Sequence, residues 1–422
     1  MTPPGRIAAF FRSVLSPDII RALIYSKTTL ASQGLGLITI SVIISFLGNE
    51  NFGVYQYAVG VIGTALLVGH LGTDAVAFRE LSLHLRHACG ALPRILLVRL
   101  TGILASLTVM WGLIHFGILH LSKGLFLAVA ATAVSESFLR IGVCWHRARH
   151  LAWADFWTTN GRALAVLVLV LLIVPHYPHA RGIALAYGIG AFLILASLLW
   201  QWRRILRVGW KVGFKWRGVL SLSFTYLDTA GNFIGTIPIL LLGHYDMFAE
   251  IGRFSVYYKY LFQFSLAATL TVQSLQPSLV QAFSCGMPTG PTIRRSIKLL
   301  LGAGILGMLG SLTVGVLFVI YLGHQRPLDL TMLAVLALLP VIFGLASLVD
   351  SVLKAARWEH LLVVSRTVGI CTCFFVALLL RHTGGIAAAI AICATFLLET
   401  VSGTLLAIRS FSHGTREKTP QQ

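Results

Sequence analysis

Apolar stretches of roughly 20 residues recur along the chain from Thr28 to Ile408, and short polar segments separate them. A helix needs roughly 20 residues to cross the hydrocarbon core of a bilayer, because each residue rises about 1.5 Å. No stretch alternates apolar and polar residues with the period of a membrane-barrel strand. The pattern predicts an all-α integral membrane protein with about twelve transmembrane helices, at residues 28–47, 53–78, 95–118, 124–144, 154–174, 182–201, 218–242, 252–276, 297–321, 330–353, 361–380 and 386–408.

The composition excludes several classes of soluble protein. Of the 422 residues, 57% are hydrophobic and 11% are charged, against about 25% charged residues in an ordinary soluble domain. So few charges cannot cover a surface exposed to water, which excludes a cytosolic enzyme, a secreted domain and a nucleic-acid-binding module.

The lysines and arginines predict the orientation in the membrane. With the N-terminus inside, the cytoplasmic segments carry 23 of them and the outer loops carry 5, and cytoplasmic loops are enriched in these residues. Both termini are therefore expected in the cytoplasm. The net charge of +19 then favours contact with anionic membrane lipid, and no nucleic-acid partner is expected.

The two halves of the chain share landmarks in the same order, which indicates an internal repeat. The matching landmarks are Leu47-Gly48 with Leu242-Gly243, Gly53 with Gly252, Glu136 and Arg140 with Asp350 and Lys354, Arg162 with Arg366, and Gly182 with Gly385. Six predicted helices in each half give both halves the same orientation, with a pseudo-two-fold axis along the membrane normal. The predicted segments are a cytoplasmic N-terminal segment (1–27), an N-terminal six-helix bundle (28–201), a basic cytoplasmic linker (202–217), a C-terminal six-helix bundle (218–408) and a cytoplasmic tail (409–422).

Two six-helix bundles with short loops are typical of a transporter, whose substrate path runs between the bundles. The chain has no GxxxxGK[ST] loop, and Arg147 stands between His146 and His150 where a HExxH motif needs glutamate. We therefore expect a transporter and not an enzyme, with no catalytic residue, no metal and no cofactor. A proton or sodium gradient, the membrane potential or the substrate gradient would drive it.

Arg162 and Arg366 lie inside predicted spans at matching positions of the repeat. A charged side chain at the membrane centre costs roughly 2.5–3.5 kcal/mol on insertion scales, so it has to face a cavity, a partner or the interface. Two arginines related by the axis can approach one central cavity, and guanidinium groups bind phosphate oxygens bidentately. The sequence predicts a cationic cavity for a phosphorylated substrate; the alternative is snorkelling to the inner interface, which is easiest for Arg366.

Further charged residues inside the spans have two interpretations each. Arg99 either snorkels or faces the cavity, and Lys259 either guides a head group at the outer side or belongs to an aromatic belt. Glu136 precedes Arg140 by four residues, as Asp350 precedes Lys354, which predicts an ion pair within each helix. Alternatively, these carboxylates take up protons as the substrate moves.

Asp228 lies near the middle of its span with no basic residue within one turn, so it is the strongest candidate for a proton or cation site. Three prolines, Pro238, Pro277 and Pro340, also lie within predicted spans. Proline bends or breaks a helix, and transporters use such points as hinges.

Two segments resemble a known family. Residues 46–82, FLGNENFGVYQYAVGVIGTALLVGHLGTDAVAFRELS, are similar to the first two helices of polysaccharide flippases. Residues 251–283, IGRFSVYYKYLFQFSLAATLTVQSLQPSLVQAF, are similar to the start of their second half and include Pro277. The chain thus resembles the polysaccharide transporter or O-antigen (Wzx-type) flippase family of the multidrug/oligosaccharidyl-lipid/polysaccharide (MOP) superfamily.

The resemblance implies a MATE-like fold and a flippase for an undecaprenyl-diphosphate-linked oligosaccharide. The cargo would be an O-antigen or another surface or exopolysaccharide repeat unit, moved from the inner to the outer leaflet of a bacterial inner membrane. Partners would be this substrate and the polysaccharide polymerase and export machinery. The resemblance directs five cations toward the diphosphate and acidic sugars: Arg162, Arg366, Arg99, Arg140 and Lys259.

Three other functions compete with this one. A multidrug or cation antiporter of the same superfamily would favour acidic and aromatic residues in its lumen, whereas five lysines or arginines lie inside the spans. A membrane enzyme of glycan assembly would need a catalytic constellation and larger outer loops. A scaffold that transports nothing would leave Arg162 and Asp228 unexplained.

Overall fold

The computed structural model of the chain is built from helices. It describes residues 17–70, 73–82, 85–117, 119, 121–149, 151–212, 233–266, 268, 271–272, 279, 283, 289–356 and 358–414. Within these ranges every regular element is helical and no strand occurs, which confirms the predicted all-α class. Helices suit a membrane because each one satisfies its own backbone hydrogen bonds.

Nine helices of the described part are long and apolar enough to cross a membrane, as in a multi-pass membrane protein. They are Leu30–Gly69, His87–His115, Lys123–Ala148, Ala152–Ile173, Ala180–Gly209, Ile293–Gly315, Leu330–Ala355, His360–Leu379 and Gly385–Arg409. The first is 40 residues long and covers most of the two predicted spans 28–47 and 53–78. Parts of the predicted spans 218–242 and 252–276 lie outside the described residues.

The helix α2 (Pro17–Gly69) is interrupted once, at Gly48. Gly48 has φ 71° and ψ 179°, a backbone conformation that glycine adopts without the penalty of a side chain. The predicted break after Leu47 is therefore confirmed. The second predicted span is shorter than expected, because α2 ends at Gly69 and a separate helix, α3 (Thr73–Leu81), follows.

The chain divides into two compact units. Unit 1 comprises Met1–Val42, Gly69–His115 and Ser122–Leu220, and unit 2 comprises Ile43–Val68, Phe116–Leu121 and Ser221–Gln422. Residues 43–68, which the sequence assigns to the N-terminal bundle, thus group with unit 2. The other predicted domain boundaries stay predictions.

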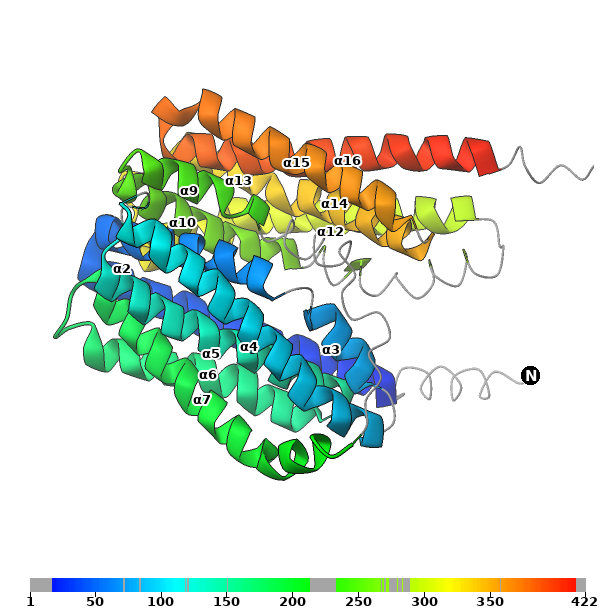
Figure 1. Ribbon diagram of the computed structural model, residues 1–422. Helices are drawn as coiled ribbons and strands as arrows, with labels where there is room; N and C mark the ends of the chain where they lie inside the picture. The colour runs from blue at the N-terminus through cyan, green and yellow to red at the C-terminus, as the bar shows by residue number, and fades with distance from the viewer. Residues whose placement is uncertain are drawn as a thin grey trace, which may run out of the picture. The chain divides into compact units, whose positions relative to one another are not determined.

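Unit 1 contains α3 and four long helices: α4 (Leu85–His115), α5 (Lys123–Ala148), α6 (Ala152–Ile173) and α7 (Ala180–Gly209). The helix α7 packs against α4, α5 and α6 (Figure 1). Trp145 and Trp202 meet edge to face in its core, with ring centroids 6.1 Å apart. The helix α7 extends to Gly209, so the first part of the predicted linker 202–217 is helical.

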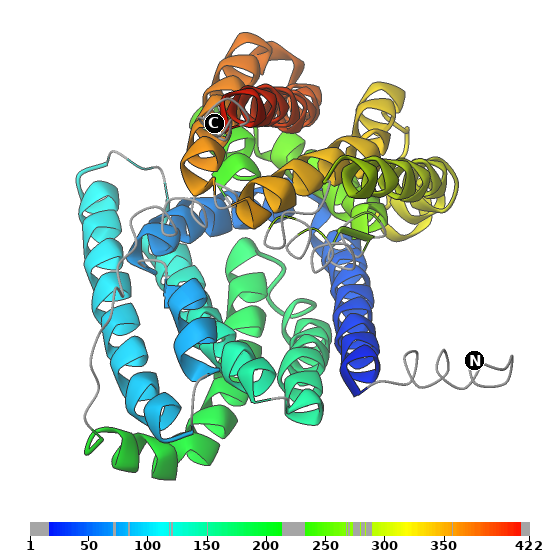
Figure 2. The same ribbon diagram turned by 90° about the vertical axis from the view of Figure 1, so that its right-hand side faces the viewer.

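The helix α2 contributes to both units, and unit 2 contains the other described helices. They are α9 (Ile237–His244), α10 (Phe248–Phe262), η1 (Gln263–Ser265), α12 (Thr289–Gly310), η2 (Ser311–Gly315), η3 (Phe318–Leu322), α13 (Leu330–Ala337), α14 (Leu339–Ala355), α15 (Glu359–Leu379), η4 (Arg381–Thr383) and α16 (Gly385–Gly414). The helices α15 and α16 form a hairpin and lie side by side in both views (Figures 1 and 2).

Two of the three prolines lie at helix starts. Pro238 is the second residue of α9, and Pro340 is the second residue of α14, directly after the break that ends α13. A proline fits the first turn of a helix, because its missing N–H would have no partner there. The hinge role of these prolines stays a prediction, and Pro277 lies outside the described residues.

Gly53 and Gly252, which the repeat places at matching positions, make a reciprocal contact within unit 2. A Cβ atom on Gly53 would overlap the carbonyl oxygen of Phe248, and one on Gly252 would overlap that of Asn49. Each overlapped residue precedes the opposite glycine by four positions. The two helices therefore cross in an equivalent way, which supports the internal repeat and requires glycine on both sides.

Candidate functional site

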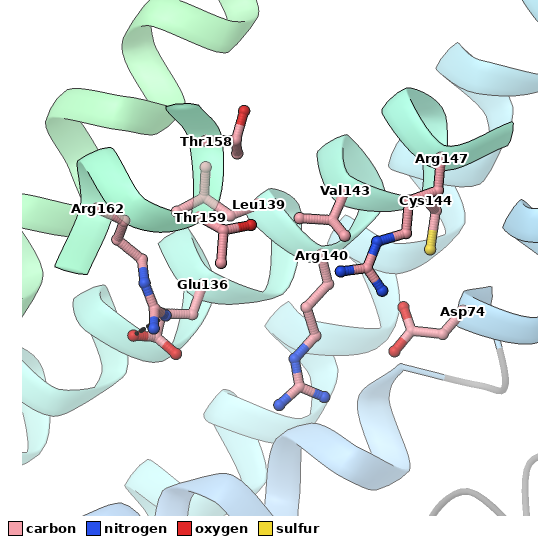
Figure 3. Close-up of a pocket in the computed structure, with 10 residues that line it drawn as sticks. All are labelled: Asp74, Glu136, Leu139, Arg140, Val143, Cys144, Arg147, Thr158, Thr159 and Arg162. Carbon is pink, nitrogen blue, oxygen red and sulfur yellow. Dashed lines mark ion pairs between the residues drawn. The ribbon is translucent and has the colours of Figure 1, made fainter. Parts of the chain in front are cut away.

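A pocket of about 470 Å³ lies in unit 1 between α3, α5 and α6 (Figure 3). Its lining residues are Asp74 from α3, then Glu136, Leu139, Arg140, Val143, Cys144 and Arg147 from α5, and Thr158, Thr159 and Arg162 from α6. Sites for small ligands measure about 300–1,000 Å³. The pocket is large enough for a phosphate-bearing head group.

Two local features bring the pocket residues together: the spacing of the side chains along α5 and the short turn between α5 and α6. Glu136, Arg140 and Arg147 follow one another at spacings that keep side chains on one face of a helix. Only residues 149–151 separate α5 from α6, so α6 runs back beside α5. This brings Arg162 opposite Glu136, and the two side chains point toward each other in Figure 3.

Glu136 pairs with Arg162 across the two helices. Arg162 Nη1 lies 2.7 Å from Glu136 Oε1, and both side chains are about one-third exposed. The predicted pair within α5, between Glu136 and Arg140, is therefore wrong. The packing of α6 against α5 supplies a nearer partner than the next turn of α5 does.

A second carboxylate near the pocket holds Arg147. Arg147 Nε donates to Asp155 Oδ2 at 3.2 Å, and Asp155 is completely buried. Thr159 Oγ1 is also buried and has no hydrogen-bond partner in the described part of the chain. Thr159 is one of the residues that line the pocket.

Arg99 lies behind the pocket and contacts Asp74, one of its lining residues. Its side chain is fully buried, pairs with Asp74, and donates from Nε to Ser137 Oγ at 2.6 Å and from Nη1 to Thr73 Oγ1 at 3.2 Å. Ser137 Oγ lies 2.8 Å from His70 Nε2. Arg99 therefore does not snorkel to an interface, and it is not among the residues that line the pocket.

The charged groups in and around this pocket comprise three carboxylates and four arginines, so one arginine has no carboxylate of its own. Each of the three carboxylates has its own guanidinium: Asp74 with Arg99, Glu136 with Arg162, and Asp155 with Arg147. Arg140 is exposed, lines the pocket, and makes no hydrogen bond or ion pair with another residue of the described ranges. Figure 3 shows it extending into the space beside Asp74.

An unpaired guanidinium among apolar helices favours an anion. Charged groups within membrane proteins normally face one another, a ligand or water, because an isolated charge there is costly. The pocket is therefore suited to an anionic ligand.

Unit 2 contains the repeat-related charges in a different arrangement. Arg366 Nη2 lies 3.2 Å from Asp350 Oδ1, and Arg366 Nε lies 3.3 Å from Glu399 Oε1. Lys354 Nζ lies 2.7 Å from Asp350 Oδ2, so the predicted pair within this helix is confirmed. Arg366 thus lies between two carboxylates and its side chain is only 18% exposed.

Glu399 is a site residue that sequence reasoning missed. It lies in the middle of α16 and is 5% exposed. The criterion that selected Asp228, a carboxylate inside an apolar span, would have selected Glu399 as well. Asp155, at the fourth position of α6, is a second carboxylate that the sequence analysis did not name, because it lies at the start of its predicted span.

The remaining predicted residues lie apart from this pocket. Lys259, in unit 2, lies over the ring of Phe52 at 5.3 Å from its centroid. Asp228 lies outside the described residues. The structure thus brings Arg140 and Arg162 together with Glu136 in one pocket, while Arg366 and Asp350 form their own cluster in unit 2.

The fold is shared with solved membrane transporters. An inward-facing multidrug resistance MATE family transporter of the MOP superfamily matches with a TM-score of 0.68 at 13% identity, over 92% of this chain and 96% of that chain. The lipid II flippase MurJ, in an inward closed conformation, matches with a TM-score of 0.72 at 14% identity, over 92% of this chain and 87% of that chain. The MATE multidrug transporter DinF-BH in complex with R6G matches with a TM-score of 0.64 at 13% identity, over 94% and 96%.

No protein-family model and no curated protein sequence matches the chain. The structural likenesses show that the chain has the fold of MOP-superfamily transporters, which confirms the predicted fold class.

Proposed function

We propose that this chain is a flippase for an undecaprenyl-diphosphate-linked oligosaccharide, an O-antigen or another surface or exopolysaccharide repeat unit. It moves this cargo from the inner to the outer leaflet of a bacterial inner membrane by alternating access, with both termini in the cytoplasm. The transporter fold supports the transport step, and one of the structural neighbours is the lipid II flippase MurJ.

The observation that carries the proposal is the unpaired Arg140 in a pocket that three arginines line. A diphosphate offers several oxygen atoms at the spacing that guanidinium groups bind bidentately. Arginine also keeps its charge at any physiological pH, so the pocket attracts an oxyanion throughout the transport cycle. A cationic cargo would meet the surplus positive charge first.

A proton or sodium gradient drives transport in this proposal. Asp228 and the carboxylates Glu136 and Asp350 are the candidate coupling residues. Replacing Asp228 by asparagine is expected to change the pH dependence of transport, measured in inverted membrane vesicles; an unchanged profile rejects its coupling role. Polysaccharide polymerase and export machinery are the proposed protein partners.

A multidrug or cation antiporter is the second candidate. This candidate is supported by two structural neighbours that are MATE multidrug transporters, one of them in complex with R6G. The pocket of unit 1 argues against it, because each described carboxylate near the pocket is already paired with an arginine.

The test uses a strain with the gene deleted. Surface polysaccharide is quantified on whole cells, and lipid-linked oligosaccharide on the cytoplasmic leaflet is quantified in inverted vesicles. The flippase proposal expects lost surface glycan with accumulated inner-leaflet intermediate, and complementation by the wild-type gene but not by Arg162→Ala, which still inserts into the membrane. Normal glycan with altered drug sensitivity would instead support the antiporter.

A further inference from the structure

We propose that the C-terminal end of α7 is a docking surface for an anionic phospholipid of the leaflet at which this helix ends, which the sequence predicts to be the inner one. The lipid phosphate binds Arg204, Arg207 and Lys211, and the apolar part of the lipid packs against Trp200 and Trp210. We call these five residues the α7 basic surface. The inference goes beyond the proposed function, because it concerns the outside of unit 1 and not its pocket.

The length of α7 places this surface at the level of the lipid head groups. The helix has 30 residues, whereas the hydrocarbon core needs roughly 20. The predicted span 182–201 accounts for the crossing, so the residues after it extend beyond the core. In both views the last turns of α7 bend and run across one end of unit 1 (Figures 1 and 2).

The end of α7 has an apolar face and a basic face. The apolar face packs into the core of unit 1 and consists of Trp202, Ile205 and Leu206, followed by the buried Gly209. Their spacing of three, one and three positions is that of one helix face. The three basic residues of the α7 basic surface lie opposite, are exposed, and follow one another at three and four positions. This end of the helix therefore presents a row of positive charge outward.

Contacts with the start of α4 hold the end of α7 in place. Arg94 Nη2 donates to the carbonyl oxygen of Val212 at 3.0 Å, and Arg94 Nη1 donates to that of Gly209 at 3.4 Å. A Cβ atom on Gly209 would overlap the carbonyl oxygen of Cys89. Arg94 thus binds the carbonyl groups that the end of α7 leaves open, so the basic row is not needed as a helix cap.

The basic row has no acidic partner in the described part of the chain. The helix α7 contains no aspartate or glutamate. The side chains of Arg204, Arg207 and Lys211 make no hydrogen bond or ion pair with another residue of the described ranges. Basic clusters beside a membrane-spanning helix attract the head groups of anionic lipids. The charge of the row therefore complements a lipid phosphate.

Two exposed indole rings favour a lipid over a water-soluble anion. Trp200 is 69% exposed and Trp210 is 53% exposed. The guanidinium carbon of Arg203 lies 3.8 Å from the centroid of the Trp200 ring, a cation–π contact that fixes the ring beside the basic row. Indole rings prefer the boundary between head groups and hydrocarbon. A phospholipid can use both the cations and the rings, whereas a free phosphate can use the cations alone.

The repeat-related helix end lacks this surface. The last ten residues of α16, 405–414, contain a single arginine, Arg409, and no lysine or tryptophan. The docking surface therefore belongs to α7 and does not follow from the shared fold of the two halves.

The test uses the full-length protein in phosphatidylcholine nanodiscs that contain a small share of photoreactive phosphatidylglycerol. Mass spectrometry of the digested protein locates and quantifies the cross-links after illumination. We expect cross-links within residues 199–212. Unlabelled phosphatidylglycerol should reduce them about fivefold, an equal addition of phosphatidylcholine should leave them unchanged, and raised salt should weaken them because it screens the head-group contact.

Matched double variants assign the effect to these residues. Arg204→Gln with Arg207→Gln should reduce cross-linking at 199–212 about tenfold, because two of the three cations are lost. Arg204→Lys with Arg207→Lys keeps both charges and should stay within about threefold of the wild type. Lys123→Gln with Arg181→Gln is the control, since it removes two exposed charges at the opposite end of α5 and α7. It should stay within about twofold.

Three results would overturn the inference: full cross-linking in the glutamine variant, an equal loss in the control, or cross-links that do not favour 199–212. Inorganic phosphate and hexaglutamate are added as competitors. Displacement by either one as effective as by phosphatidylglycerol would also overturn it, in favour of a free phosphate or an acidic protein segment. Thermal unfolding is measured for every variant, and if the glutamine variant unfolds early, the lysine variant and the salt dependence of the wild type decide.

Discussion

The two units contain repeat-related charges with the same spacing in sequence but different ion pairs. In each unit an acidic residue precedes a basic one by four positions, Glu136 with Arg140 and Asp350 with Lys354. In unit 1, Glu136 pairs with Arg162 on the next helix, and Arg140 makes no hydrogen bond or ion pair in the described part of the chain, although it interacts electrostatically with Asp74. In unit 2, Asp350 uses one oxygen for Lys354 and the other for Arg366. The same local pattern thus gives two different results. In unit 1, Arg140 makes no ion pair, and we call it the open cation. In unit 2, every charge of the group Asp350, Lys354, Arg366 and Glu399 is paired, and we call this group the closed cluster.

The difference comes from the last helix of each half. The helix α16 carries Glu399, which lies 3.3 Å from Arg366 and adds a second carboxylate to that cluster. Its counterpart, α7 (Ala180–Gly209), contains no aspartate or glutamate. The described cluster of unit 2 therefore balances its cations internally, whereas the described cluster of unit 1 has one more arginine than carboxylates. Repeat symmetry in the fold does not extend to the chemistry of the two clusters.

The largest loss of stability is expected at the glycine contact that both halves of the repeat share, Gly53 with Gly252. Gly53→Ala and Gly252→Ala should each destabilise the protein by about 3 kcal/mol, because each new Cβ overlaps a backbone oxygen that cannot turn away. Thermal unfolding of the purified protein measures this. Gly63→Ala is the control, because a Cβ there meets nothing. Equal losses at Gly53 and Gly252 support the reciprocal crossing, and a silent substitution at either position contradicts it.

The next effect concerns the closed cluster of unit 2. Glu399→Gln should lower the free energy of unfolding by about 2 kcal/mol, because it removes one of the two carboxylates that flank the largely buried Arg366. The matched variant Glu136→Gln breaks a pair that is one-third exposed and should cost less than about 1 kcal/mol. Chemical denaturation of both variants compares them. A larger loss for Glu136→Gln would reverse our assignment of the open and closed clusters.

The third effect separates the two clusters in function. Arg140→Gln should reduce transport about tenfold, equivalent to about 1.4 kcal/mol, because the ligand loses its unpaired cation. Lys354→Gln, the same change at the repeat-related position, should leave transport within about twofold, since Lys354 is exposed and pairs only at the surface. Lipid-linked oligosaccharide on the cytoplasmic leaflet of inverted vesicles measures both. Similar losses for the two variants would place the ligand in both units.

The smallest effect is expected at Arg140→Lys. A lysine keeps the positive charge but cannot bind two oxygens in a fork, so transport should fall by about two- to threefold. The same vesicle measurement applies. A loss as large as that of Arg140→Gln would mean that bidentate geometry, and not charge, decides binding at this position.

Much of the fold follows from local sequence rules. Long apolar stretches become helices because no other structure satisfies an isolated backbone segment in hydrocarbon. The break at Gly48 could be predicted because glycine tolerates the positive φ found there. The pairing of Asp350 with Lys354 could be predicted because both residues lie on one helix face. Each of these features depends on neighbours within a few positions.

The candidate site was only partly predictable, and the reason is physical. Arg140, Arg162 and Glu136 could be named, since a charge in an apolar span needs a partner or a cavity. Which guanidinium meets which carboxylate depends on the rotation and approach of neighbouring helices. That is why Glu136 pairs with Arg162 across α5 and α6 and why Arg99 is buried against Asp74.

The sequence by itself determined an all-helical membrane protein whose two halves share landmarks in the same order, because period, length and composition are local quantities. The tertiary structure decided that Arg140 is the open cation and Arg366 the closed one, because Glu399, 33 residues further along the chain than Arg366, is brought beside it by the α15–α16 hairpin. Contacts between helices are set by packing, and the spacing within either helix carries no record of them.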